Sequence, residues 1–146
     1  MNWYLKNLKL SQAIIAYHGS ASKIDVFNTS QTGPLGPGIY FTSNLQEAKT
    51  YANIATNMRD LKGGKSEKKI YKVSLNINKA FDISNSSKNP TIYDATGAKS
   101  LSELIDKMDE LKKQGYDGVI ARHARGSIEY SVFSPSQIKI LEVIEI

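Results

Sequence analysis

The chain has 146 residues, a length that suits one hydrophobic core, so we expect a single domain over residues 1–146. Hydrophobic residues make up 40% of the chain and charged residues 23%, which is an ordinary globular composition. No apolar run is long enough to cross a bilayer, and the start lacks the pattern of a secretory signal. The absence of cysteine excludes disulfides and thiolate metal sites. These features predict a cytoplasmic protein without membrane contact.

The formal net charge is +5, which favours an anionic partner such as a nucleotide, a nucleic acid or an acidic protein. Part of this charge lies in the basic stretch Arg59–Lys69. That stretch lacks the interleaved aromatic residues of a nucleic-acid platform, and it is typical of a solvated loop.

The first half of the chain predicts two strands and a helix. The apolar run 13–19 ends in glycine and predicts a buried strand. The segment 39–43 is rich in β-forming residues and predicts a second strand. Asn44 is a candidate N-cap with Glu47 as its capping-box partner, so we expect a helix over residues 45–58.

The second half predicts more strands and one further helix. Residues 69–77 alternate between apolar and polar side chains, which indicates a half-buried strand, and residues 80–83 extend it or begin another. A helical stripe of apolar residues runs from Leu101 to Leu111 after a capping box of Ser100 and Glu103. Three later strands are predicted over residues 116–121, 128–133 and 137–146. About six or seven strands and two helices, with strands grouped late in the chain, predict an α+β fold.

Several common motifs are excluded. The sequence "GGKS" at residues 63–66 is not a phosphate-binding loop, because Arg59 replaces the required glycine and a strand follows instead of a helix. The glycines between residues 33 and 38 have the wrong spacing for a dinucleotide fingerprint, and no Gly-x-Ser-x-Gly elbow occurs. The only histidines are His18 and His123, and neither has an acidic cluster near it in the sequence. We therefore expect no metal site.

Three motifs occur in a fixed order: "YHGS" at 17–20, "GPGIYFTSNLQEAKTYA" at 36–52 and "IEYSVFSPSQIKIL" at 128–141. Each alone has a structural explanation, as a histidine at a strand end, a core tyrosine or a solvent-facing glutamate. Together, with Tyr40 and Tyr51 eleven residues apart, they closely resemble the His-Tyr-Glu class of ADP-ribosyltransferases. This class includes diphtheria-toxin-like and poly(ADP-ribose)-polymerase-like enzymes. In particular, the motifs resemble the small catalytic domains of phage polyvalent proteins and related bacterial toxins.

The resemblance spans roughly residues 15–143 and implies a fold in which two packed, antiparallel-rich β-sheets form an NAD⁺ cleft. The implied activity is that of a mono-ADP-ribosyltransferase, a glycosyltransferase that cleaves NAD⁺, releases nicotinamide and passes ADP-ribose to a macromolecule. NAD⁺ would be a co-substrate, and no metal would be needed. Two alternatives stay open: an NAD⁺ glycohydrolase, with water as acceptor, and an inactive module that binds NAD⁺, ADP-ribose or nucleic acid.

The resemblance also assigns roles to the two tyrosines. Tyr40 from the strand and Tyr51 from the helix would sandwich the nicotinamide, a flat cationic ring that aromatic faces hold by stacking and cation–π attraction. The flexible stretch 32–38 would be the donor loop of the class, whose glycines allow it to approach the dinucleotide and move over it.

The same resemblance implies that His18 donates hydrogen bonds to ribose hydroxyls, that the backbone of Gly19 holds the carboxamide, and that Ser20 helps on the adenosine side. Glu129 would be the catalytic residue. Breaking the nicotinamide–ribose bond builds positive charge on the sugar, as in glycoside cleavage. An ionised carboxylate that holds the 2′-hydroxyl would stabilise this charge.

The acceptor is open in the sequence. Arginine-modifying relatives carry a glutamate two residues before the catalytic one, but this chain has Ser127 there, so we infer no arginine specificity. Arg122 and Arg125 lie where the class has its target-recognition loop, and they would suit an acidic or phosphorylated acceptor or would simply be solvated. A protein target is favoured, a nucleic acid target stays open, and the oligomeric state is not predicted.

Overall fold

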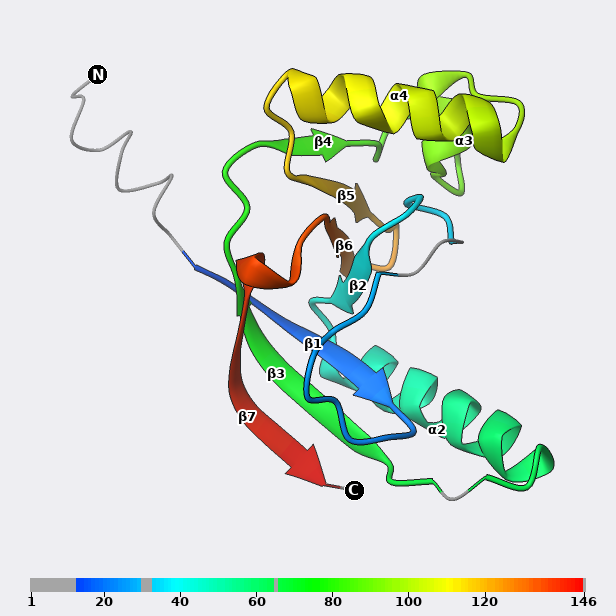
Figure 1. Ribbon diagram of the computed structural model, residues 1–146, viewed down its shortest axis with the longest axis vertical. Coiled ribbons are helices and arrows are strands. Elements are labelled where there is room, and N and C mark those ends of the chain that lie inside the picture. Colours follow the sequence, from blue (N-terminus) through cyan, green and yellow to red (C-terminus); the bar gives the residue numbers. More distant parts are fainter. Residues whose placement is uncertain (1–12, 30–32, 65, 146) are drawn as a thin grey trace.

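The computed structural model describes residues 13–29, 33–64 and 66–145, which form strands, α-helices and one 3₁₀ turn (Figure 1). The elements in chain order are β1 (Ile14–Ser20), β2 (Ile39–Thr42), α2 (Leu45–Leu61), β3 (Lys69–Leu75), β4 (Ala80–Asp82), α3 (Ile92–Thr96), α4 (Leu101–Lys113), β5 (Gly118–Arg122), β6 (Ile128–Val132), η1 (Pro135–Gln137) and β7 (Ile138–Glu145). The predicted α+β class is confirmed. No helix within the described ranges has the length and apolar character needed to span a membrane.

The strands form a single mixed sheet in the order β4-β5-β6-β2-β1-β3-β7, in which only β4 and β5 run parallel. The two sheets expected from the sequence correspond to its halves, β4-β5-β6-β2 and β1-β3-β7. These halves are joined where β1 meets β2, through the single residue pair Tyr17 and Thr42, whereas β1 pairs with β3 over all seven of its residues. The sheet is therefore continuous but nearly divided, and β1 and β2 diverge on either side of this seam.

Helix α2 packs against β1 (Figure 1) because small residues face each other at the contact. Ala48 and Ala52 are fully buried on the helix. On the strand, a Cβ atom added to Gly19 would lie 2.0 Å from the Ala48 carbonyl oxygen and 2.8 Å from the Ala52 amide nitrogen. A side chain at position 19 would therefore push α2 away from the sheet, which gives this glycine a structural role independent of any ligand.

Two hydrophobic clusters form the core, and the first contains residues from both halves of the sheet. The first lies around β1, β2, β3 and β6 and contains the buried residues Ala16, Phe27, Ile39, Phe41, Tyr71, Val73, Leu75, Tyr130 and Val132. The second joins β5 to the helices α3 and α4 and contains Leu35, Ile83, Ile92, Ala98, Leu104, Met108, Leu111, Val119 and Ala121. In Figure 1, α2 and the α3–α4 pair accordingly lie at opposite ends of the molecule.

The helices agree with the sequence prediction in position but not in every detail. Both long helices start at the predicted residue, and α2 continues to Leu61 instead of residue 58. The predicted stripe on α4 is only partly buried, since Leu101 and Ile105 stay about 45% and 44% exposed. Helix α3 was not predicted, because five residues are too few to show a helical period.

The connection between β6 and β7 is fixed by one side chain. The Gln137 Oε1 atom accepts hydrogen bonds from the backbone amides of Phe133 (3.1 Å) and Ser134 (3.0 Å). Its Nε2 atom donates to the carbonyl oxygens of Asn76 (3.0 Å) and Asp117 (2.8 Å). The glutamine therefore ties the turn that follows β6 to the ends of β3 and β5, which explains the "QIK" element of the third motif in structural terms.

We predict that Gly19→Ala destabilises the protein by about 1–3 kcal/mol, because the new methyl group must displace the α2 backbone rather than a flexible side chain. Urea unfolding of both proteins measures this difference. The neighbouring Ser20→Ala serves as a control and should lose no more than about 1 kcal/mol, the value of an ordinary hydrogen bond. An equally stable Gly19→Ala variant would contradict the close packing of β1 and α2.

Candidate active site

A cleft of about 370 Å³ opens at the seam between β1 and β2, a volume within the usual range for small-molecule sites. It is lined by Tyr17, His18, Gly19, Gly33, Pro34, Tyr40, Phe41, Thr42, Tyr51 and Glu129. Five of the six residues singled out in the sequence thus lie at one cleft. The exception is Ser20, whose hydroxyl donates to the Ser22 carbonyl (2.9 Å) and accepts from the Ser22 amide (3.1 Å).

His18 is held at the end of β1 in a defined protonation state. Its Nδ1 atom lies 2.7 Å from the Tyr40 carbonyl oxygen, and because a carbonyl can only accept, Nδ1 must carry a proton. The ring also contacts Phe27 and Phe41, with centroids 5.3 and 5.5 Å away. Burial lowers the pKa of His18, against the raising effect of the bond to Tyr40. The neutral ring therefore offers Nε2 as an acceptor, so a ribose hydroxyl would donate to His18, the reverse of the direction expected from the sequence.

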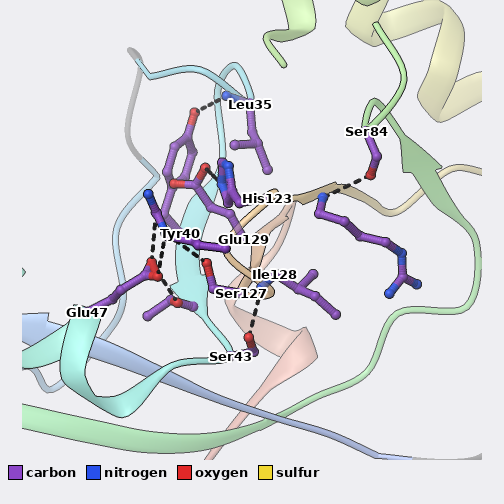
Figure 2. Close-up of polar contacts among 12 residues, drawn as sticks. Leu35, Tyr40, Ser43, Glu47, Ser84, His123, Ser127, Ile128 and Glu129 are labelled. Carbon is purple, nitrogen blue, oxygen red and sulfur yellow. Dashed lines mark hydrogen bonds and ion pairs between the residues drawn. The ribbon is translucent and has the colours of Figure 1, made fainter. Parts of the chain in front are cut away.

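Tyr40 is fixed by the loop that precedes it. Its hydroxyl donates to the Gly36 carbonyl oxygen (2.6 Å) and accepts from the Leu35 amide (3.0 Å) (Figure 2). The same loop approaches the ring so closely that a Cβ atom on Gly33 would lie 2.5 Å from the hydroxyl oxygen. Burial and, to a lesser extent, Glu129 raise the pKa of Tyr40, although the bond from Leu35 opposes this. The phenol stays protonated and serves to hold the loop.

The stretch 32–38, expected to be flexible, is anchored over its described part. Leu35 is fully buried in the second cluster, and the Ile92 amide donates to the Pro34 carbonyl oxygen at 2.7 Å. A turn closes through the Gly36 amide and the Gly33 carbonyl, 3.1 Å apart, with Gly36 in the left-handed region at φ +80°. Thr32 lies outside the described residues. The stretch over residues 33–38 thus forms part of the wall of the cleft.

Tyr51 supplies an aromatic face from the other side of the seam. It projects from α2 two turns after the N-cap and remains 47% exposed, although it lines the cleft. Partial burial raises the pKa of Tyr51, and the carboxylates of Glu129 and Glu47 raise it further. A half-exposed ring at the cleft has a free face for a flat ligand, whereas a core tyrosine does not.

Glu129 lies on β6, beside Thr42 of β2 and Ala121 of β5. Its side chain is only 16% exposed, and its Oε1 atom lies 3.5 Å from the Nε2 atom of His123. Burial raises the pKa of Glu129 above its ordinary value, while the charge of His123 and the hydrogen bond with it lower it. The carboxylate is therefore held in a cleft where ionisation is costly, as is common for functional groups.

A second carboxylate, that of Glu47, lies near Glu129 and is bound by Arg125. The Arg125 Nε and Nη2 atoms both donate to it at 3.1 Å, the Thr42 hydroxyl donates at 3.4 Å, and the Arg125 Nε atom also lies 3.2 Å from the Ser127 hydroxyl (Figure 2). Burial alone would raise the pKa of Glu47, but the bonds from Arg125 and Thr42 bring it below its ordinary value. An ionised Glu47 thus connects α2 with the turn before Glu129.

This arrangement changes two interpretations from the sequence. Asn44 does accept from the Glu47 amide (2.9 Å), but the Glu47 side chain bonds to Arg125 instead of closing a capping box. Arg125, expected to face an acceptor or solvent, makes two hydrogen bonds to Glu47 at 3.1 Å, whereas Arg122 has only Asp82 at 3.9 Å. The two arginines are equally exposed, at 62% and 61%, so they differ in how closely their carboxylate partners are bound.

Sequence reasoning missed Glu47 and His123 as members of the site. Glu47 had a sufficient local explanation as a cap. The signal for His123 was present, because two predicted strands flank it and antiparallel pairing brings Ala121 opposite Glu129. The His123 amide donates to the Ser127 carbonyl and the Gly126 amide to the His123 carbonyl, both at 2.9 Å, so a tight turn returns the chain beside the glutamate.

Metal ligands do not gather at the cleft. Within residues 13–29, 33–64 and 66–145, no three His, Asp or Glu side chains are grouped so that they could hold a metal ion. The cleft is instead lined by one neutral imidazole, one buried carboxylate, the Thr42 hydroxyl, backbone atoms and three tyrosine side chains. This set suits an aromatic, hydroxyl-bearing ligand.

The sequence model of the family "ADP-Ribosyltransferase in polyvalent proteins" matches residues 12–142. The chain belongs to this family. The match includes every residue at the cleft, and the resemblance inferred from the three motifs is confirmed at the level of the family. Domains of this family use NAD⁺ as a substrate.

A solved structure supports the same fold. A structure of the M. tuberculosis MbcT–MbcA toxin–antitoxin complex matches with a TM-score of 0.52 at 10% sequence identity, covering 92% of this chain and 85% of that chain. A crystal structure of an anti-CRISPR protein matches with a TM-score of 0.41 at 14% identity, covering 93% and 97% of the two chains. No curated protein sequence matches the chain. At 10% identity the first structure shows the fold alone, and the TM-score of the second is too low to show even a shared fold.

We predict that Glu129→Gln raises the melting temperature of the protein at pH 7 and does not lower it at acidic pH. A carboxyl whose pKa is raised on folding stabilises the folded state below the pKa of the unfolded chain, and this contribution is lost as the pH rises through the folded value. The neutral amide avoids that loss, so the difference should shrink below about pH 4. Calorimetry at both pH values measures it. A variant that melts well below the wild type at pH 7 would show that the ionised glutamate stabilises the fold.

Proposed function

We propose that the protein is an NAD⁺-dependent mono-ADP-ribosyltransferase that releases nicotinamide and transfers ADP-ribose to a macromolecule. The observation that carries the proposal is the convergence at one cleft of His18, Tyr40, Tyr51 and Glu129, which come from β1, β2, α2 and β6. Membership of the ADP-ribosyltransferase family supports it. A structural explanation would have to account for each of these four side chains separately.

In the proposed complex, the nicotinamide ring lies between Tyr40 and Tyr51. The Tyr40 ring is held by its hydroxyl, so its position is fixed before the ligand arrives, whereas the half-exposed Tyr51 ring closes the other side. The cationic ring is attracted to both aromatic faces. The backbone of Gly19 contacts the carboxamide, and the unprotonated Nε2 atom of His18 accepts from a ribose hydroxyl. Ser20 follows Gly19 on β1 but does not line the cleft, so its proposed contact is with the more distant adenosine side of the dinucleotide.

The proposed chemistry is displacement at the C1′ atom of the nicotinamide ribose. The bond between C1′ and the nicotinamide nitrogen breaks, and its electron pair leaves with nicotinamide, which becomes neutral. The acceptor supplies the electron pair for the new bond at C1′ and loses its proton to solvent. Positive charge develops on the sugar between these events, and the ionised Glu129, bound to the 2′-hydroxyl, stabilises it from within a largely buried site.

A protein is the acceptor that we favour, and the mildly basic chain, with a net charge of +5, supports an anionic or acidic one. Arg122, the last residue of β5, is 61% exposed and lies directly before the turn that leads to Glu129. We also propose a cytoplasmic site of action, in keeping with the cysteine-free sequence.

NAD⁺ labelled on its adenylate, incubated with the protein and a bacterial lysate, tests the proposal. Label that is released by protease supports transfer to protein, and label released by nuclease supports transfer to nucleic acid. Label found only in free ADP-ribose would make the protein an NAD⁺ glycohydrolase. NAD⁺ that binds but is never cleaved would indicate an inactive binding module and overturn the proposal.

We predict that Glu129→Gln lowers the rate of nicotinamide release at saturating NAD⁺ by on the order of 10²–10³-fold. The amide keeps the shape but not the charge, and that charge matters most in the transition state, so NAD⁺ affinity should change little. Chromatographic assay of nicotinamide and calorimetric titration with NAD⁺ give the two quantities. Equal rates for wild type and variant would exclude Glu129 as the catalytic residue.

We predict that Tyr51→Ala weakens NAD⁺ binding by about 5- to 150-fold, the range that corresponds to the loss of one base–aromatic stack of roughly 1–3 kcal/mol. The fold should change little, because this ring is 47% exposed. Ile54→Ala is the matched control, since Ile54 lies one turn further along α2, is 52% exposed and does not line the cleft. Equal NAD⁺ affinities of the two variants would leave Tyr51 without a role in binding.

A further inference from the structure

His123 is the titratable side chain that directly contacts Glu129. Its Nε2 atom lies 3.5 Å from Oε1 of the glutamate, and the two side chains are 24% and 16% exposed. Neither the motifs nor the family match assigns a role to this histidine. It is not among the residues that line the cleft.

The backbone holds His123 rigidly in this position. Its amide donates to the Ser127 carbonyl and its carbonyl accepts from the Gly126 amide, both at 2.9 Å, which closes a tight turn between β5 and β6. Gly126 has φ +96°, in the left-handed region that favours glycine, and Glu129 is fixed by pairing with Ala121. Because strand pairing sets both ends of this turn, the contact between His123 and Glu129 follows from the register of the hairpin.

The contact with His123 makes the two carboxylate oxygens of Glu129 different from each other. His123 contacts Oε1, and among the described residues no polar contact is made by Oε2. An imidazole held 3.5 Å from Oε1 restricts the rotation of the carboxylate, so Oε2 is presented in one orientation. A glutamate that must hold a single sugar hydroxyl gains from this restraint, because pre-organised groups need no reorganisation during the reaction.

Charged and titratable groups face Glu129 from several elements. The turn before β6 contributes His123 and Arg125, α2 contributes Glu47 and Tyr51, and β2 contributes Tyr40. Glu47 disfavours a second negative charge nearby, but it is paired with Arg125. Direct contact with the Glu129 carboxylate is made by His123.

We infer that His123 is a positioning residue for the proposed reaction: it orients the Glu129 carboxylate and keeps it ionised in its largely buried site. This inference rests on the proposed function. Burial raises the pKa of Glu129 and His123 lowers it, so we expect removal of the imidazole to raise this pKa further. The acid limb of the pH–rate profile, where Glu129 takes up a proton, should then move to higher pH.

The test compares nicotinamide release by wild type, His123→Ala and His123→Gln across the acidic and neutral range. For His123→Ala we expect a rate about five- to tenfold lower at pH 7, because the carboxylate loses one polar contact that orients it. We also expect an acid limb shifted upward by about one unit, the low end of what an opposite charge within ~4–6 Å produces. His123→Gln keeps a neutral donor, so it should recover much of the rate at pH 7 while its acid limb stays shifted.

Lys107→Ala is the charge control, because Lys107 is an exposed cation on α4 and is not among the charged groups that act on Glu129. Its acid limb should coincide with that of the wild type. A merely structural His123 would alter the melting temperature and leave the acid limb in place. An unshifted acid limb in His123→Ala therefore overturns the inference, whatever the stability of that variant.

A second measurement separates this inference from the proposed function. The carboxyl pKa of Glu129 can be followed by NMR with ¹³C-labelled glutamate, and Glu129→Gln identifies the signal. If the wild type releases no nicotinamide, the proposed function fails, but this measurement still decides the contact. A higher carboxyl pKa in His123→Ala than in the wild type supports His123 as the residue that keeps Glu129 ionised, and equal values reject it.

Discussion

The close packing of α2 on β1 is the constraint on which the rest of the site depends. The helix can approach the strand because Gly19 has no side chain at the point where Ala48 and Ala52 contact it. That approach brings Tyr51 and Glu47, which α2 carries, to the strand that ends in His18. Gly19, which the resemblance assigns to ligand binding, is thus also required for the packing of α2 on β1. A loss of activity in a Gly19 variant therefore does not distinguish a role in binding from a role in the fold.

The seam between β1 and β2 is the second feature of the fold on which the cleft depends. Full pairing would fill the space that the cleft occupies, but these strands share only the pair Tyr17 and Thr42. The backbone carbonyl of Tyr40 bonds to His18 across the gap, so the two halves of the sheet are tied by side-chain contacts where strand pairing is missing. A nearly divided sheet therefore provides both a rigid frame and an opening.

Within this frame the two acidic side chains have different environments. Glu47 has the guanidinium of Arg125 and the hydroxyl of Thr42, so its pKa lies below the ordinary value despite burial. Glu129 is more buried, and its single imidazole contact does not offset the effect of burial, so the pKa of Glu129 lies above that value. Pairs of carboxyl groups whose environments separate their pKa values commonly divide their roles. Here the first connects α2 to the turn, and the second is the group proposed to act on the ligand.

The sequence by itself determined the strands, the two long helices and the family. The seven strands lie within two residues of their predicted limits, because alternation and β-forming residues are local signals, and the order of the three motifs indicated the family confirmed by the match to residues 12–142. Only the tertiary structure decided the rest. Whether Glu47 caps its helix or binds Arg125, and whether His123 meets Glu129, depend on strand pairing and helix packing between distant segments. Such contacts have no period in the sequence, because their energies arise only when the folded chain brings the partners together.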